Sequence, residues 1–98
     1  MKMPAIYIMA NKQFGTLYVG VTSDLARRVF EHRNDMIPGF TSQYGCKMLV
    51  YYFFFETMSD AIMIEKKLKK GSRARKIQLI EASNPEWRDF YQDILKGL

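Results

Sequence analysis

The chain has 98 residues, of which 48% are hydrophobic and 14% aromatic, a composition that indicates a folded globule and excludes a disordered segment. Its formal net charge of +5 favours a polyanionic partner such as nucleic acid. No apolar run has the length of a membrane span, and the single cysteine, Cys46, cannot form an internal disulfide and fits a reducing compartment, so the expected location is the cytoplasm.

The first two elements predict a β-hairpin. Over 4–9 and 16–21 the aliphatic residues fall at alternate positions, as in a strand, and the polar segment 11–15 between them ends in glycine. Only residues 1–4 precede the first strand, which is too short for a signal peptide. In a regular register, Tyr7 and Tyr18 lie on one face of the hairpin. The opposite face carries the aliphatic residues Ile6, Ile8, Leu17, Val19 and Val21.

A helix is expected next, capped by Ser23 and extending to about Arg33. Arg28 and His32 stand four residues apart and therefore share one face of it. Its expected apolar stripe consists of Leu25, Ala26, Val29 and Phe30.

Residues 34–45 contain proline, two glycines and several polar residues, which predicts a loop. Three side chains of this loop are placed to reach a ligand, although its composition is that of an ordinary loop: Thr41, Ser42 and Tyr44.

The second half predicts one strand followed by helices. Residues 48–55 are apolar on both faces and rich in aromatic and β-branched types, which indicates a strand buried on both sides. A capping box at 57–60 begins a helix to about Lys70, with Glu65 at the edge of its inner stripe of Ala61, Ile64 and Leu68. Ser72 caps a helix over 73–82.

A last helical segment is expected to begin at Pro85 and to pack on the core. Its apolar residues are Trp87, Phe90, Tyr91 and Ile94. No internal repeat or linker interrupts the chain, so a single domain over 1–98 is expected.

Two tripeptides in the expected hairpin have a recognisable spacing: Ala5-Ile6-Tyr7 and, after ten intervening residues, Tyr18-Val19-Gly20. Arg28 follows ten positions after Tyr18, and Glu65 lies on a later helix. In this combination the chain resembles the GIY-YIG nuclease domain family, with alanine for the first glycine and valine for the second isoleucine. That family includes homing endonucleases and the nicking module of bacterial excision repair.

The overall pattern, including Asn84-Pro85-x-Trp87, is most similar to the small standalone bacterial members of the family. Pattern and resemblance together predict an α/β fold of the α+β type. Its sheet has three strands and is small and mainly antiparallel, and helices flank it in the order β-β-α-β-α-α.

The resemblance implies a set of site residues. Tyr7 and Tyr18 match the motif tyrosines, and Arg28 the catalytic arginine. His32 matches a histidine one turn later, and Asn84 a late active-site asparagine. Glu65 matches the glutamate that binds Mg²⁺ or Mn²⁺.

Chemically, a tyrosine has a pKa of about 10 and is a base only where cations stabilise its phenolate. Arg28 and a bound metal would supply that stabilisation. We therefore hypothesise Tyr7 as the base, with Tyr18 or His32 positioning water or assisting proton transfer. Magnesium commonly takes only one or two carboxylates, so Glu65 alone is chemically sufficient.

A run of basic residues over 66–76 and Arg27 beside Arg28 predict contacts with a phosphate backbone, largely independent of sequence. The residues assigned to nucleic-acid binding are Arg27, Lys66, Lys69, Lys70, Arg73, Arg75 and Lys76. Each feature also has an ordinary structural explanation when taken alone. The tyrosines suit a cross-strand pair, and Glu65 suits an ion pair with Lys69 one turn later.

The preferred hypothesis is a divalent-metal-dependent DNA endonuclease or nickase, acting in DNA repair or recombination, with RNA as an alternative substrate and no membrane partner. One rival is a nucleic-acid-binding module with little turnover. A second rival is an adaptor that binds a protein through the aromatic C-terminus around Trp87.

Overall fold

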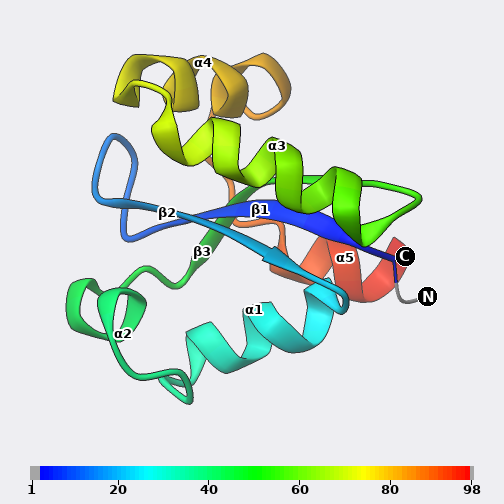
Figure 1. Ribbon diagram of the computed structural model, residues 1–98. Coiled ribbons are helices and arrows are strands. Elements are labelled where there is room, and N and C mark those ends of the chain that lie inside the picture. Colours follow the sequence, from blue (N-terminus) through cyan, green and yellow to red (C-terminus); the bar gives the residue numbers. More distant parts are fainter. Residues whose placement is uncertain (1–2, 98) are drawn as a thin grey trace.

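The computed structural model describes residues 3–97 and shows a three-stranded antiparallel sheet (Figure 1). The outermost residues of the expected domain, 1, 2 and 98, lie outside this range. The strands are β1 (Ala5–Ala10), β2 (Leu17–Thr22) and β3 (Met48–Phe54), in the order β2-β1-β3. The predicted fold class is confirmed.

Helices cover both faces of the sheet. On one face lie α3 (Met58–Lys70) and α4 (Arg73–Ser83), and on the other lie α1 (Leu25–Arg33), α2 (Phe40–Tyr44) and α5 (Tyr91–Gly97) (Figure 1). Within the described residues, no helix combines the length and apolar character that a membrane crossing requires.

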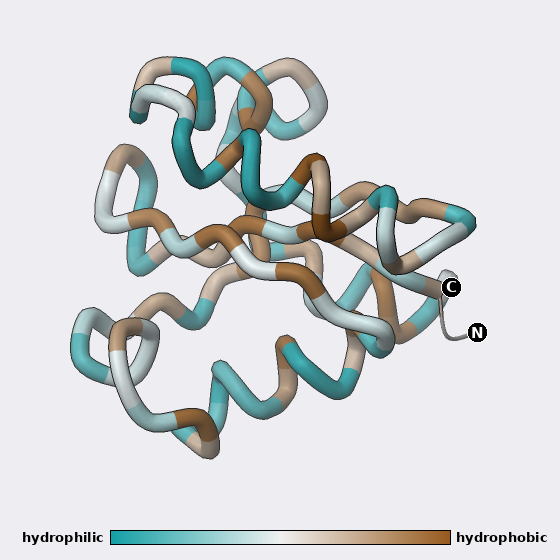
Figure 2. The backbone as a smooth tube through the Cα atoms, in the orientation of Figure 1, coloured by the Kyte–Doolittle hydropathy of each residue, from teal (hydrophilic) through white to brown (hydrophobic). Residues whose placement is uncertain are grey.

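The sheet separates two apolar layers, as the hairpin pattern predicts. The layer under α3 and α4 includes Ile6, Ile8 and Val19, whereas Tyr7 and Met9 belong to the layer under α1 and α5. Figure 2 shows the matching pattern on α3, where hydrophobic and hydrophilic stretches follow one another along the helix. All six residues of β1 are buried because β1 is the central strand.

The prediction that residues 48–55 are buried on both sides is wrong. They form β3, which is an edge strand, and its Phe53 is exposed. Ile8 pairs with Tyr51 and Met9 with Leu49, so Val50 is an extra residue in the ladder. This bulge turns Val50 and Tyr51 to the same side of the sheet. A run of uniformly apolar residues gave no sign of either feature.

Two expectations for α1 need correction. Its N-cap is Asp24 and not Ser23, since the Asp24 carboxylate accepts a hydrogen bond from the Arg27 backbone N–H. Phe30, expected in the apolar stripe, is exposed. By contrast, Thr57 and Ser72 cap α3 and α4 as predicted.

The segments 34–45 and 85–90 also differ from expectation. The first, predicted as a loop, contains the short helix α2, which lies between Gly39 (φ 116°) and Gly45 (φ 65°). The second, predicted as helix, is a turn at 85–86 followed by irregular chain, in which Phe90 N–H donates to the Leu49 carbonyl of β3 and Asp89 accepts from the Leu49 N–H. These bonds attach the segment to the edge of the sheet, and α5 begins only at Tyr91.

Candidate active site

Tyr7 is fully buried and lies beside a glycine on the neighbouring strand. Tyr7 of β1 pairs with Gly20 of β2, and a Cβ atom on Gly20 would lie 2.4 Å from both Cζ and the hydroxyl of Tyr7. No side chain can replace the glycine hydrogen here without displacing the ring. Gly20 therefore leaves room for the phenol against the edge strand.

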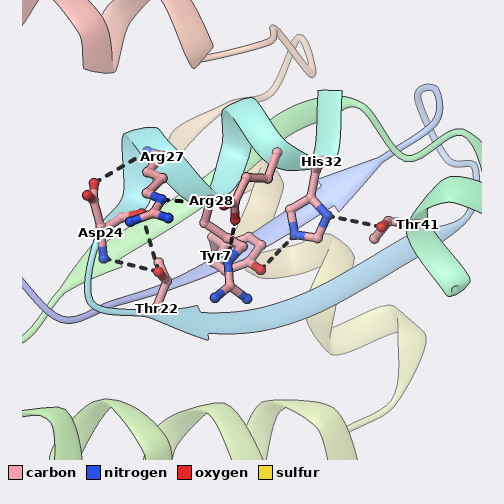
Figure 3. A network of polar contacts seen from close by, with 8 residues as sticks. Tyr7, Thr22, Asp24, Arg27, Arg28, His32 and Thr41 are labelled. Atoms are coloured by element: carbon pink, nitrogen blue, oxygen red, sulfur yellow. Dashed lines mark hydrogen bonds and ion pairs between the residues drawn. The ribbon is translucent and has the colours of Figure 1, made fainter. Parts of the chain in front are cut away.

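A chain of polar contacts links Tyr7 to α1 and α2 (Figure 3). The Tyr7 hydroxyl lies 2.8 Å from His32 Nε2, and His32 Nδ1 lies 3.0 Å from the Thr41 hydroxyl. His32 and Thr41 are both buried. The Tyr7 ring also packs near Tyr18, with 6.3 Å between the ring centroids. Three elements thus hold the Tyr7–His32–Thr41 network, and one of them is the unpredicted helix.

Burial controls the protonation of this network. It raises the pKa of Tyr7, and the neighbouring Tyr18 adds to the rise while the Arg28 guanidinium opposes it. Burial lowers the pKa of His32, and Arg28 lowers it further. Both groups are therefore neutral near pH 7. We assign the tautomer in which the Tyr7 hydroxyl donates to Nε2 and Nδ1–H donates to Thr41.

Arg27 and Arg28 are joined by one carboxylate. Arg28 Nε lies 3.3 Å from one oxygen of Glu31, and Arg27 Nε lies 3.4 Å from the other. These three residues line a hollow of about 270 Å³ at the start of α1. Its remaining lining residues are Thr22, Ser23 and Asp24. Glu31 thereby bridges the two arginines.

Glu65 lies on α3, which covers the face of the sheet opposite α1. It is only 7% exposed, and its carboxylate lies 2.8 Å from Lys69 Nζ. Its negative charge contributes to the raised pKa of Tyr7, although it is the smallest of the causes, and its hydrogen bond raises the pKa of Lys69. Across residues 3–97, no group of three or more His, Cys, Asp or Glu side chains is arranged to hold a metal ion.

A cleft of about 440 Å³ opens over β2, between α2 and the junction of α3 with α4. Tyr18 lines it, together with the cations Lys69, Arg73 and Lys76. The rest of its lining is Thr16, Leu17, Val19 and Phe40. Three of the predicted nucleic-acid contacts therefore face one cleft that also presents a motif tyrosine.

The other basic residues predicted to bind nucleic acid on α3 and α4 lie outside this cleft. Lys66 and Lys70 are exposed on α3, and Arg75 lines a separate hollow with Lys67. Two cleft cations also support the fold. The Arg73 guanidinium donates to the carbonyls of Phe14 and Gly15 at 2.6 and 2.7 Å, and Lys76 Nζ lies 3.2 Å from the Gly71 carbonyl at the end of α3.

Asn84 is not brought to this region. Its side-chain amide donates to the carbonyls of Val50 and Arg88, and its carbonyl accepts from the Arg88 N–H. Asn84 is buried and holds the 84–88 turn against β3, the edge of the sheet opposite β2. The contacts of Asn84 in this structure are therefore structural, and its active-site role stays a prediction.

The aromatic C-terminus is likewise turned inward. Trp87 is buried, and its indole N–H donates to Glu81 at 2.9 Å. Ile94 is buried too, and Phe90 and Tyr91 pack against the core. The adaptor hypothesis, which needs an exposed surface around Trp87, is wrong in this respect.

Sequence reasoning missed three contributors to the site. Gly20 belongs to the second tripeptide, but its spatial role requires the strand register. Thr41 was predicted as a loop residue able to reach a ligand, not as a partner of His32, and no pattern singled out Glu31. The two glycines at 39 and 45, six residues apart, are the one sequence signal that could have marked α2 as a defined element.

Comparison with known proteins gives consistent similarities. Residues 3–78 match the family model of the GIY-YIG catalytic domain. A UPF0213 protein of Clostridium perfringens is 33% identical over 92 residues, which cover 94% of this chain and 98% of the relative. One of Staphylococcus saprophyticus is 36% identical over 75 residues, covering 76% and 90%. The solution NMR structure of a UPF0213 protein from Bacillus halodurans aligns with a TM-score of 0.55 at 26% identity, covering 91% of this chain and 94% of that one.

Proposed function

We propose, since this chain belongs to the GIY-YIG nuclease family, that it is a divalent-metal-dependent endonuclease or nickase that hydrolyses phosphodiester bonds in DNA, in repair or recombination. The observation that carries the proposal is the contact of Tyr7 with His32, with Tyr18 packed near both rings. The charges of Arg28 and Glu65 both act on the pKa of Tyr7. The spacing of residues in the sequence singles out the same set.

The Tyr7–His32 pair supports general base chemistry. As the attacking water gives a proton to the Tyr7 oxygen, the original phenolic proton passes to His32 Nε2, 2.8 Å away. The hydroxide attacks phosphorus, the bond to the leaving oxygen breaks, and that oxygen takes a proton from the Tyr18 hydroxyl or from solvent. Thr41 holds the imidazole in the required orientation and is a positioning residue.

Arg28 is suited to the phosphoryl oxygens. Its guanidinium is permanently charged and can donate two parallel hydrogen bonds to a phosphate. A phosphate must compete with Glu31, which now lies 3.3 Å from Arg28 Nε. Arg28 lowers the pKa of Tyr7 and so favours its phenolate form, whereas its effect on the pKa of His32 opposes protonation of the imidazole.

Glu65 fits the single carboxylate that a hydrated magnesium or manganese ion requires. It is nearly buried, and Lys69 Nζ already occupies a cation position on its carboxylate. Glu65 would hold the ion once Lys69 moves aside. The ion would supply charge neutralisation for the phosphoryl and leaving oxygens.

One observation favours the second candidate, a nucleic-acid-binding module with little turnover. Lys69 neutralises Glu65, and burial holds Tyr7 in its neutral form. In that arrangement the cleft cations bind phosphate, but no group in the network is an effective base.

Plasmid nicking tests the proposal. Supercoiled plasmid is incubated with the purified protein and Mg²⁺ or Mn²⁺, alongside Tyr7→Phe, Arg28→Ala and Glu65→Gln. We expect nicking by the wild type and losses of about 100-fold or more in each variant, the scale expected when a base or charge-stabilising group is removed. Glu86→Gln, an exposed glutamate in the 84–88 turn, is the matched control and should nick normally.

Equal residual nicking in all variants would show a contaminating nuclease and end the catalytic proposal. Salt-sensitive DNA binding without nicking under either metal would leave the binding module as the function.

A further inference from the structure

A continuous series of aromatic rings leads from the candidate active site to the surface. Tyr18 of β2 lies 6.0 Å from Phe40 of α2, and Phe40 lies 4.7 Å from Tyr44, measured between ring centroids. Phe40 and Tyr44 are each 46% exposed. We call these three residues the aromatic platform.

The fold presents this platform without using it as core. The buried residue of α2 is Thr41, which contacts His32, whereas Phe40 and Tyr44 stand four residues apart on the helix and remain exposed. Gly39 and Gly45 have positive φ and define both ends of the helix. The same short helix therefore orients the proton network and displays two aromatic rings.

Cations line the same cleft as two rings of the platform. Phe40 and Tyr18 line it together with Lys69, Arg73 and Lys76. Lys69 Nζ also lies 5.9 Å from the centroid of the Tyr18 ring. Aromatic rings beside a row of cations match the two parts of a nucleotide, since a base stacks on a ring and its phosphate pairs with a cation.

A base-paired duplex cannot use the rings. Each base inside a duplex is covered on both faces by its neighbours, so only an unpaired or extruded base can stack on a side chain. Contacts with duplex phosphates would need the cations alone. A strand with unpaired nucleotides would use both the rings and the cations.

We propose that the aromatic platform stacks an unpaired base of the DNA strand whose phosphates follow the cleft cations, so that the substrate class is DNA with single-stranded character, such as a flap, a gap or a free strand. This rests on the proposed function, because the platform begins at Tyr18. It adds the substrate class to that function.

Metal-free binding tests it separately from catalysis. Fluorescence anisotropy in EDTA compares a labelled single strand, the same strand with abasic sites, its full duplex and a duplex with a flap. The single strand and the flap should bind about 10-fold more tightly than the abasic strand and the duplex, as expected for loss of one stacked base. Phe40→Leu should remove that advantage and leave duplex binding unchanged.

Matched variants separate stacking from folding. Phe30→Leu removes a ring that is equally exposed, at 47%, but lies on α1 away from the cleft lining, and should bind like the wild type. Phe40→Trp should keep the preference for the single strand. A thermal melt shows whether Phe40→Leu folds. If it does not, Tyr44→Leu is the substitute test, and it should weaken single-strand binding.

If Phe40→Leu weakened binding of the duplex and the abasic strand as much as binding of the intact single strand, the stacking proposal would be overturned. Equal affinity of the wild type for all four ligands would overturn it too. An RNA strand bound more tightly than the DNA strand, with the same Phe40→Leu loss, would overturn the choice of DNA. Nicking of duplex plasmid without any single-strand preference would refute this inference and leave the proposed function standing.

Discussion

At His32, three neighbours determine the chemistry of one side chain. Its two ring nitrogens contact Tyr7 and Thr41, and the charge of Arg28 together with burial keeps the ring neutral. The sequence predicted only the relation to Arg28, because residues four apart on a helix share a face. The contacts with Tyr7 and Thr41 span 25 and 9 residues and depend on how α1 and α2 pack on the sheet.

The lowered pKa of His32 predicts how stability depends on pH. Between the unfolded pKa of 6.5 and the lower folded value, the unfolded chain binds a proton that the folded chain does not. Stability is therefore full above pH 6.5 and falls as the pH falls through the folded pKa. His32 is the only histidine, so urea unfolding at pH 7.5 and 5.5 reports on this group with little interference.

His32→Gln is the comparison variant, because an amide keeps hydrogen-bonding groups but does not titrate. We expect the loss of stability between the two pH values to be smaller in this variant. An equal loss in both proteins would show that other groups cause it.

Among the elements, the pairing of β1 with β2 brings Tyr7 next to Gly20 and near Tyr18 in the candidate site. The alternation of residues predicted the two strands and the shared face of Tyr7 and Tyr18, since a period of two needs no tertiary information. The bulge at Val50 and the short helix α2 could not be predicted in this way. The first is hidden in a uniformly apolar run, and the second depends on contacts with distant residues.

Gly20→Ala tests the close contact between these strands. The new methyl group would lie 2.4 Å from the Tyr7 ring, which is buried and cannot move freely. We expect a loss of about 1–3 kcal/mol in the free energy of unfolding, typical of an overpacked core, and a weaker Tyr7–His32 contact. Urea denaturation measures the first.

Gly97→Ala is the control for that measurement, because a Cβ atom there has no neighbour within 4 Å. It should not lower stability. A Gly20→Ala protein as stable as the wild type would show that the Tyr7 ring has another position available.

For the molecule as a whole, composition predicted a basic protein but not the distribution of its charge. The structure places Lys69, Arg73 and Lys76 around the cleft and Lys67 and Arg75 around a different hollow. This division depends on how α4 turns back beside α3 after Gly71, which a linear run of lysines and arginines does not reveal. Asn84 and Trp87 illustrate the same limit, because both matched a pattern and both make structural contacts.

The division predicts different salt dependence for two lysines of one helix. If Lys69 contacts phosphate, Lys69→Gln should reduce the slope of log K against log salt by about 0.9 for duplex DNA, the value expected when one phosphate is no longer neutralised. Lys67→Gln makes the same charge change outside the cleft and should leave the slope unchanged. Anisotropy titrations at several salt concentrations measure both, and equal slopes in the two variants would place the DNA elsewhere.

The central position of β1 also governs when the molecule can fold during synthesis. β1 is made first, but it pairs with β3, whose last residue is Phe54, and Glu65 follows later still. A nascent chain can close the β1–β2 hairpin early, whereas the far edge of β1 stays unpaired until β3 emerges. Each newly made molecule therefore remains incompletely folded until β3 has left the ribosome.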